Sequence, residues 1–238
     1  MQISGRTAFV TGANRGLGRH LAQQLRDRGA NVYAAARTPE SIDFDGVTPV
    51  ALDLVDAESV SRAVAQTSDV SILINNAGSS MGASLLTGDW SAIRLEAETH
   101  YFGTLSLIRA FAPALARQDQ SAILNILSVL SWLAFPGSGG YCAAKSAEWA
   151  MTNALRQELA QQGTRVIGLH VAYMDTGMTR NLDVPKADPA DIATTALNGI
   201  EAESFEIIAD DTSRMVQGGL AGGVAALYPD LRVAEATA

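Results

Sequence analysis

Short apolar runs alternate with longer segments of helical periodicity along most of the chain. Thr7–Thr11, Asn31–Ala35 and Ser71–Asn75 have the length and apolar content of buried strands. These runs lack strict polar alternation, which is typical of a sheet that is covered on both faces. Strands that are joined through helices form right-handed crossovers and therefore a parallel sheet. The alternation predicts an α/β fold.

Further segments complete a doubly wound sheet of about seven strands. The other expected strands are Thr48–Leu52, Ala122–Leu127, Arg165–Val171 and Ser204–Ala209. The expected helices are Gly16–Arg28, Asp56–Thr67, Asp89–Ala116, Ser138–Gln162 and Pro189–Ile200. In a sheet of this kind, ligands bind at the carboxyl ends of the strands, where the strand order reverses.

Single residues mark where these elements begin, end or bend. Gly29 and Gly163 follow helices at positions that favour a left-handed backbone. Asp56 and Asp188 fit N-cap positions, because a carboxylate there accepts hydrogen bonds from unpaired backbone N–H groups. Pro113 should kink the long helix or mark a break near its end.

The chain shows no internal repeat, low-complexity tract or linker, so we expect one domain over residues 1–238. Substrate-contacting loops are expected at about 173–200, by analogy with the loop-borne sites of open sheets. Three segments have soft, turn-rich composition: 79–88, 179–186 and the tail after Gly218. Gly103, inside the long helix, is expected to be a packing glycine.

The composition excludes several classes of function. The chain carries 25 acidic against 17 basic residues and a net charge of −8, which disfavours nucleic acid and anionic membrane surfaces as partners. The single cysteine, Cys142, excludes an intramolecular disulfide, and no residues have metal-ligand spacing. With no secretory signal pattern and no long apolar span, we expect a soluble cytoplasmic protein with no metal. His20 and His170 are expected to be structural.

A glycine-rich turn follows the first strand and opens the first helix, over Thr11–Gly18. Gly12, Gly16 and Gly18 permit a tight turn that places unpaired N–H groups and the positive end of the helix dipole against a bound phosphate. The position between a first strand and a first helix favours a dinucleotide site over an ordinary glycine-rich turn.

The second strand ends at Ala36 and Arg37, where a dinucleotide fold faces the adenosine ribose. An acidic residue here would bind the 2′-hydroxyl of NAD, whereas an arginine pairs with the 2′-phosphate of NADP. Arg15, in the turn, can approach the same phosphate. The alternative is that both arginines are solvated surface residues.

Polar residues also follow the next two strands. Asp53 and Leu54 come after the third strand, and Asn75-Asn76-Ala77-Gly78 come after the fourth. Asp53 could accept a hydrogen bond from an adenine amino group. The asparagine pair could hold the backbones of neighbouring strands in register.

The sharpest local signal is Tyr141 with Lys145 at the opening of a helix. Residues four apart share a helix face, and a nearby ammonium group favours the phenolate and lowers the pKa of a tyrosine. A tyrosine tuned in this way exchanges a proton with a carbonyl or alcohol oxygen. Ser128, thirteen residues earlier, could donate to the same oxygen.

Together these residues resemble the short-chain dehydrogenase/reductase family, over about residues 7–176. The resemblance implies a Rossmann-type fold and an NADP(H) cofactor. It implies that Tyr141 is the acid/base, that Ser128 orients the substrate oxygen, and that Lys145 binds the nicotinamide ribose. The cofactor contacts it implies are Gly12, Asn14, Arg15, Gly16, Leu17, Gly18, Arg37, Asp53, Leu54, Asn76, Ala77, Gly78, Tyr141, Lys145 and Thr176.

The sequence departs from the family pattern at two places. His100 stands where the family has an asparagine whose main-chain carbonyl belongs to a proton relay, so His100 either joins the catalytic group or only packs in the helix. Val171-Ala172 replaces a Pro-Gly pair, which puts the path of the loop below the nicotinamide in doubt. Asp175, Thr176 and Met178 further along still match.

We therefore expect an NADP(H)-dependent oxidoreductase that interconverts a small ketone or aldehyde and an alcohol, preferably by reduction. One alternative is a nucleotide-sensing protein that has lost turnover, and another is an epimerase or dehydratase on the same fold. Trp132, Leu133 and Phe135 could line an apolar substrate pocket. The apolar content of the expected helices Asp89–Ala116 and Ser138–Gln162, including Leu105, Ile108, Phe111, Trp149 and Leu155, predicts a homo-oligomer, dimer or tetramer.

Overall fold

The computed structural model describes residues 1–231, and seven parallel strands form its central sheet. The strand order is β3-β2-β1-β4-β5-β6-β7, so the order reverses between β1 and β4. The strands are β1 Thr7–Thr11, β2 Asn31–Ala36, β3 Thr48–Ala51, β4 Ile72–Asn75, β5 Ser121–Ile126, β6 Thr164–His170 and β7 Glu206–Ile208. This is the predicted Rossmann-type α/β domain, and its reversal point is where such folds bind ligands.

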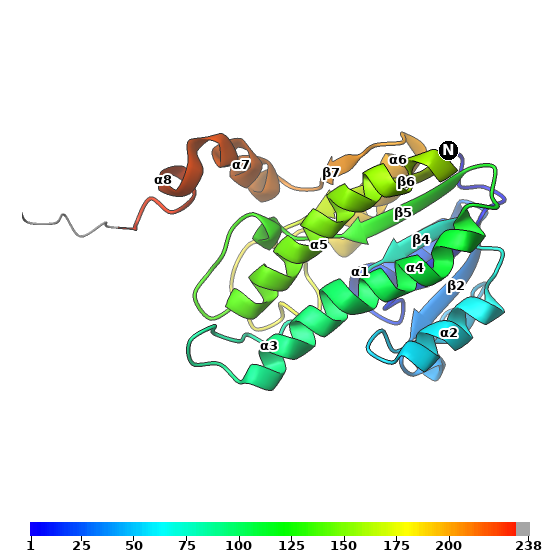
Figure 1. The fold of residues 1–238 in the computed structure, drawn as a ribbon, viewed down its shortest axis with the longest axis horizontal. Helices are drawn as coiled ribbons and strands as arrows, with labels where there is room; N and C mark the ends of the chain where they lie inside the picture. Colours follow the sequence, from blue (N-terminus) through cyan, green and yellow to red (C-terminus); the bar gives the residue numbers. More distant parts are fainter. Residues whose placement is uncertain (232–238) are drawn as a thin grey trace, which may run out of the picture.

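Helices cover both faces of the sheet (Figure 1). One face packs against α1 Gly16–Asp27 and α6 Pro189–Glu201. The other packs against α2 Ala57–Gln66, α4 Thr104–Leu115 and α5 Gly139–Glu158. The remaining helices are α3 Trp90–Ala97, α7 Asp211–Gly219 and α8 Gly223–Leu227. Because both faces are buried, the strands are apolar throughout, as the sequence indicated.

The predicted helix ends are confirmed. Gly29 and Gly163 have φ values of 84° and 78°, the left-handed backbone that glycine adopts without steric cost. Asp56 accepts a hydrogen bond from the N–H of Glu58 at the start of α2, and Asp188 caps α6 in the same way. These caps fix where α2 and α6 begin beside the sheet.

The predicted helix over 89–116 is interrupted by a π-helical segment, Glu98–Gly103, between α3 and α4. A π turn inserts one extra residue and rotates the side chains that follow it. Gly103 is the packing glycine expected, because a Cβ there would lie 2.8 Å from the Leu54 carbonyl oxygen. α4 ends at Leu115, two residues after Pro113, as that proline predicted.

The tail after Gly218 is expected to be soft, and in the residues described it contains a short helix, α8, that follows α7. α7 is capped by Asp210, which accepts a hydrogen bond from the Ser213 N–H, and α8 follows it. The Tyr228 hydroxyl accepts a 2.9 Å hydrogen bond from the Ala134 N–H. The two helices lie beyond β7 at one end of the molecule (Figure 1). Their apolar side chains pack against the β5–α5 loop.

Most of the side chains that suggested self-association lie inside the molecule. Ile108, Phe111 and Leu155 are buried in the core between α4, α5 and the sheet. Trp149 packs against Trp132 and His170 instead of facing solvent. The apolar pattern of these residues reflects the packing of the helices on the sheet. The sequence alone could not distinguish this packing from an interface between subunits.

Candidate functional site

A cleft of about 690 Å³ opens at the carboxyl ends of the strands, at the reversal point between β1 and β4. Its walls contain every predicted catalytic and cofactor residue except Gly18. The cleft thus joins the glycine-rich turn, the end of β2, the β4 asparagines and the start of α5. No helix in residues 1–231 is long and apolar enough to cross a membrane, and no metal-binding cluster occurs there.

The glycine-rich turn has the close backbone packing that a phosphate site requires. Gly12 and Gly16 have φ values of 64° and 53°, in the left-handed region. Gly18 is buried behind the turn, and a Cβ on it would lie 2.2 Å from the Gly12 carbonyl oxygen. Gly18 therefore shapes the turn and does not line the cleft. The N-terminus of α1 faces the cleft, with its unpaired N–H groups available to an anion.

The β4 asparagines fix this turn to the sheet. The Thr11 hydroxyl accepts hydrogen bonds from the N–H groups of Asn76 and Ala77, both at 2.9 Å. The Asn76 side chain donates to the Thr11 carbonyl oxygen at 2.8 Å. These bonds join β1 to β4 at the floor of the cleft, so the prediction that the asparagines hold neighbouring backbones is confirmed for Asn76, whereas Asn75 binds the Asn125 side chain.

Two arginines line the end of the cleft next to β2. Arg15 and Arg37 are exposed, and neither forms an ion pair with an acidic residue among residues 1–231. Ala36, buried at the end of β2, leaves no carboxylate at the position that would bind a ribose 2′-hydroxyl. An arginine pair without internal partners fits a phosphate monoester better than a bare hydroxyl.

Asp53 and Leu54 lie on the wall next to the end of β3. The Asp53 Oδ1 accepts from the Val55 N–H at 3.1 Å, and its own N–H donates to the Ser59 hydroxyl. The Asp53 carboxylate is thereby oriented, and its Oδ2 accepts no hydrogen bond from the residues described. Leu54 packs against Gly103, which couples this wall to the π segment.

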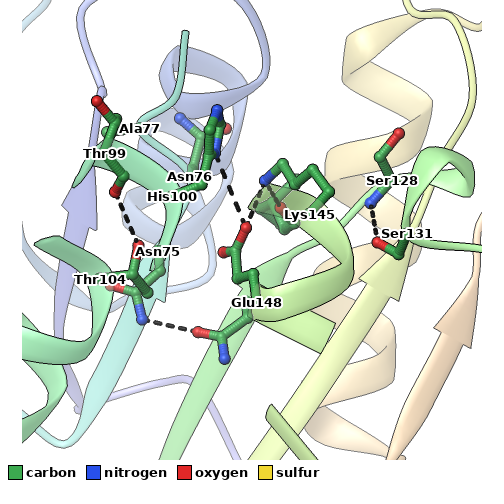
Figure 2. Close-up of polar contacts among 12 residues, drawn as sticks. Asn75, Asn76, Ala77, Thr99, His100, Thr104, Ser128, Ser131, Lys145 and Glu148 are labelled. Carbon is green, nitrogen blue, oxygen red and sulfur yellow. Dashed lines mark hydrogen bonds and ion pairs between the residues drawn. The ribbon is translucent and has the colours of Figure 1, made fainter. Parts of the chain in front are cut away.

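Ser128 follows β5 and caps a short 3₁₀ turn, Val129–Ser131. Its hydroxyl oxygen accepts a 3.1 Å hydrogen bond from the Leu130 N–H. Its N–H donates to the Ser131 hydroxyl, and Figure 2 shows this contact. With the oxygen committed as an acceptor, the Ser128 O–H is left to donate into the cleft.

Lys145 is buried, and its ammonium forms two 2.7 Å hydrogen bonds, to the Ile126 carbonyl oxygen and to Glu148 Oε2. Glu148 is only 2% exposed, so the two charges form a buried ion pair (Figure 2). Burial lowers the pKa of Lys145, but its interactions with Glu148 and Tyr141 raise it more, and the net shift is upward. Lys145 is therefore held charged at neutral pH.

Tyr141 lies one helical turn before Lys145, whose nitrogen is 6.0 Å from the phenol ring centre. Burial raises the pKa of Tyr141, while Lys145 lowers it, Glu148 raises it and the Ser128 side chain lowers it. The net pKa is raised, which corrects the expectation that Lys145 alone would lower it. The sequence could not weigh burial and Glu148 against one cation. In this structure the phenol is protonated at neutral pH.

His100 lies in the π segment, 1% exposed, with its ring edge-on to Tyr141 at 5.2 Å. Its Nε2 lies 2.7 Å from the Ser79 carbonyl oxygen, and its Nδ1 lies 3.8 Å from Glu148 (Figure 2). Burial, followed by the Lys145 charge, lowers the pKa of His100 to about 3. A neutral imidazole of this kind holds the β4–α3 loop against the π segment, and it is not in the imidazolium form that a general acid needs at neutral pH.

The loop after β6 has an anchor that replaces the missing Pro-Gly pair. The Ala172 N–H donates a 2.7 Å hydrogen bond to Asp210, the same residue that caps α7. Thr176 lies against Gly16 across the cleft, where a Cβ on that glycine would be 3.3 Å from the threonine methyl group. Thr176 therefore lines the cleft. The path of the loop after β6 is fixed by Asp210, which follows β7.

Sequence reasoning missed two parts of the site. Glu148 stands three residues after Lys145, and that i,i+3 spacing was the available signal. A buried chain of hydrogen bonds also runs from Asn75 to Asn125, on to Thr152 and then to the Glu148 carbonyl oxygen. It ties β4 and β5 to α5, but its members lie far apart in sequence and carry no shared pattern.

Comparisons with known proteins agree with this geometry. A short chain dehydrogenase from Burkholderia cenocepacia, solved in complex with NADP, is 38% identical, covers 98% of this chain and 100% of its own, and has a TM-score of 0.93. The 3-oxoacyl-(acyl-carrier-protein) reductase of Vibrio cholerae is 31% identical over 77% of this chain and 79% of its own. The 3-ketodihydrosphingosine reductase of Bacteroides thetaiotaomicron is 29% identical over 82% of this chain and 76% of its own.

The family model for short chain dehydrogenases matches residues 6–187, which contain the glycine-rich turn, Asn76, Ser128, Tyr141 and Lys145. The strand order, the cleft and the placement of these residues agree with that match. The chain is an oxidoreductase of the short-chain dehydrogenase/reductase family.

Proposed function

We propose that this protein is an NADP(H)-dependent reductase that converts a ketone or aldehyde into an alcohol. The observation that carries the proposal is the placement of Tyr141, Ser128 and Lys145 together in the wall of the cleft, where burial raises the pKa of the Tyr141 phenol. Reduction needs a proton donor at the carbonyl oxygen, and a phenol with a raised pKa supplies one at neutral pH. NADPH, when bound, supplies the hydride.

Each residue has one task in this proposal. Ser128 donates a hydrogen bond to the substrate carbonyl oxygen, and Tyr141 delivers the proton to it. Lys145, held charged by Glu148, contacts the nicotinamide ribose and stabilises the phenolate that forms. The cofactor is held by the α1 N-terminus, Asp53, Thr176 and the other predicted contacts, while Arg15 and Arg37 favour the 2′-phosphate of NADP.

The substrate side of the cleft favours a carbonyl compound with an apolar body. Three loops that follow β4, β5 and β6 carry exposed apolar side chains, and Met178 among them lines the cleft: Met81, Leu85 and Leu86 after β4, Phe135 after β5, and Tyr173, Met178, Leu182 and Val184 after β6. The first two loops touch, because the Gly140 N–H donates to the Ala83 carbonyl oxygen at 3.3 Å. Grouped apolar exposure of this kind marks a binding surface. Relatives named for 3-oxoacyl and 3-keto substrates agree with a ketone.

Two further parts of the proposal concern the whole protein. We propose self-association through the outer side of α3 and the π segment, where Trp90, Leu95 and Phe102 are 65%, 39% and 53% exposed. A cytoplasmic location, where NADPH drives reductions, belongs to the same proposal.

Tyr141→Phe tests the mechanism, because it removes one hydroxyl and keeps the ring. Turnover of a good ketone should fall by roughly 10²–10⁴-fold, the range for losing a general acid, while NADPH affinity stays within about twofold. Tyr33→Phe, the same change on β2 away from the cleft, is the matched control and should keep wild-type turnover. Retained activity in Tyr141→Phe would refute the assignment.

A matched panel tests the substrate class. Aliphatic and aromatic ketones should be reduced with a higher kcat/KM than hydroxylated ketones of the same carbon number, and Met178→Glu should narrow that difference. A preference for the hydroxylated series would refute the apolar body and leave the reductase mechanism standing. Binding of NADPH with no turnover of any carbonyl compound would instead favour the nucleotide-sensing alternative.

A further inference from the structure

His170 is buried at the end of β6, behind Ser128. Its polar contacts there go beyond the structural role expected from the sequence. Its ring stacks on Trp132, with centroids 3.7 Å apart and planes 17° apart. Its Nδ1 lies 3.2 Å from the Ser128 carbonyl oxygen. Its Nε2 lies 3.1 Å from Glu206 Oε1 on β7. The imidazole thus connects the edge of the sheet to the residue that faces the substrate oxygen.

The Ser128 backbone is held from two sides. Its carbonyl oxygen accepts from the Ser131 N–H at 2.9 Å and faces His170 with its second lone pair. Its side-chain oxygen accepts from the Leu130 N–H. A change in the His170 contact therefore moves the 3₁₀ turn and, with it, the direction of the Ser128 O–H.

We propose that His170 is a positioning residue, which aims the Ser128 hydroxyl at the substrate oxygen by donating from Nδ1 to the Ser128 carbonyl, and that Glu206 controls whether Nδ1 carries the proton. This proposal rests on the proposed function, because it assumes that Ser128 binds the substrate oxygen.

The number of N–H groups on the His170 ring determines what Glu206 does. The Ser128 carbonyl can only accept, and so can an ionised Glu206. A neutral imidazole has one N–H for these two acceptors, so one of the two contacts loses its hydrogen bond. A second proton on His170 satisfies both acceptors, because the imidazolium donates from Nδ1 and Nε2 together.

The charged groups that face His170 are Glu206 from β7 and Arg156 from α5, whose guanidinium lies 4.0 Å from Glu206. Burial lowers the pKa of His170 below its ordinary 6.5, the Ser128 carbonyl and Glu206 raise it, and Arg156 lowers it further. The net pKa is lowered. His170 therefore gains its second proton only below pH 6.5, and in that range the Ser128 hydroxyl should point better at the substrate oxygen.

Two substitutions of His170 separate the two nitrogens. An asparagine places its amide N–H where Nδ1 lies, whereas a glutamine reaches toward the place of Nε2. His170→Asn should keep kcat/KM for a ketone within about threefold of wild type. Below pH 6.5, where Nδ1 carries its proton, His170→Gln should lose roughly five- to tenfold, the value of one hydrogen bond. NADPH affinity should stay unchanged in both variants.

A double-mutant cycle shows whether His170 acts through Ser128. Ser128→Ala should itself lower kcat/KM, and His170→Gln added to it should change kcat/KM by less than about twofold. Equal losses from His170→Gln in both backgrounds would mean a general structural role and overturn the proposal. If Ser128→Ala has wild-type activity, the proposed function fails at Ser128, and this outcome is distinct from the first.

Glu206→Gln tests the control of the tautomer without changing the core. Its amide can donate to Nε2 at any pH, so Nδ1 keeps its proton for Ser128. Wild-type kcat/KM should rise as the pH falls below 6.5, and Glu206→Gln should be flat over that range with activity near the acid plateau. A Glu206→Gln profile that follows the wild type would overturn the role of Glu206.

Discussion

Glu148 offers the sharpest test of how the site holds its cation. Its carboxylate lies 2.7 Å from the Lys145 nitrogen, and the two residues are 2% and 5% exposed. Removing one member of a buried ion pair leaves the other charge without compensation, which costs about 3–5 kcal/mol. Glu148→Leu should therefore lower the free energy of unfolding by that amount. In a domain of this size, the loss corresponds to a Tm lower by roughly 6–20 °C.

The same change should alter the chemistry of Lys145. Glu148 raises the pKa of Lys145 and burial lowers it, so without Glu148 the burial effect dominates. The folded-state pKa then drops below the ordinary 10.5, and the ammonium is lost as the pH rises through the new value. Turnover of Glu148→Leu should therefore fall with rising pH in a range where the wild type is constant. Thermal melts and kcat measured from pH 6 to 10 provide the readouts.

Two further variants show whether the uncompensated charge is the cause. Glu158→Gln removes an exposed carboxylate from the same helix and should leave Tm within about 2 °C of wild type. Lys145→Met combined with Glu148→Leu removes both charges and should be clearly more stable than Glu148→Leu alone, although inactive. A double variant as unstable as the sum of the single variants would refute the reasoning.

Two other predictions concern the cofactor and assembly. Ala36→Asp with Arg37→Leu places a carboxylate at the ribose and removes a phosphate partner, so the ratio of kcat/KM for NADPH over NADH should fall by at least about tenfold, the value of one charge-assisted bond, in steady-state assays. Equal use of both cofactors by the wild type would contradict the role of Arg37. Phe102→Glu should shift the sedimentation mass from an oligomer to one chain, and a single-chain mass for the wild type would refute self-association.

The fold was largely predictable, because burial on both faces of a parallel sheet imposes apolar strands and amphipathic helices. Gly29, Asp56 and Asp188 mark element ends through local backbone chemistry, and the structure confirms them. The π segment at Glu98–Gly103 was not predictable, since an extra residue in a helix is settled by packing against Leu54 and Ser79. The α7 helix was missed although Asp210 marks its cap.

The parts of the site that one local motif carries were predictable. The parts that depend on contacts between residues far apart in the sequence were not. Tyr141 and Lys145 are visible from their spacing, whereas the burial that sets their pKa values is a property of the fold. His170 illustrates the second case: its contact with Ser128 spans 42 residues and that with Glu206 spans 36. A histidine within an apolar strand has no local feature that indicates either partner.

The two ends of the cleft differ in charge, and the difference bears on the direction of the reaction. At one end, Arg15 and Arg37 have no acidic partner among the residues described. At the other end, Glu148 offsets the Lys145 charge, so the cation does not overcome the burial that raises the pKa of Tyr141. The phenol is the ready proton donor that reduction needs, whereas alcohol oxidation must begin from the phenolate.

Difference absorbance of the phenolate, taken between wild type and Tyr141→Phe without nucleotide, measures this asymmetry. Because the folded-state pKa of Tyr141 is raised above its ordinary value of 10.0, less than half of Tyr141 should be phenolate at pH 10, and almost none at neutral pH. The rate of alcohol oxidation should keep increasing with pH across the neutral range, and ketone reduction should stay constant there. A phenolate signal near pH 7 to 8 in the nucleotide-free protein would show that Lys145 outweighs burial and Glu148. It would remove the electrostatic reason for placing this enzyme on the reductive side.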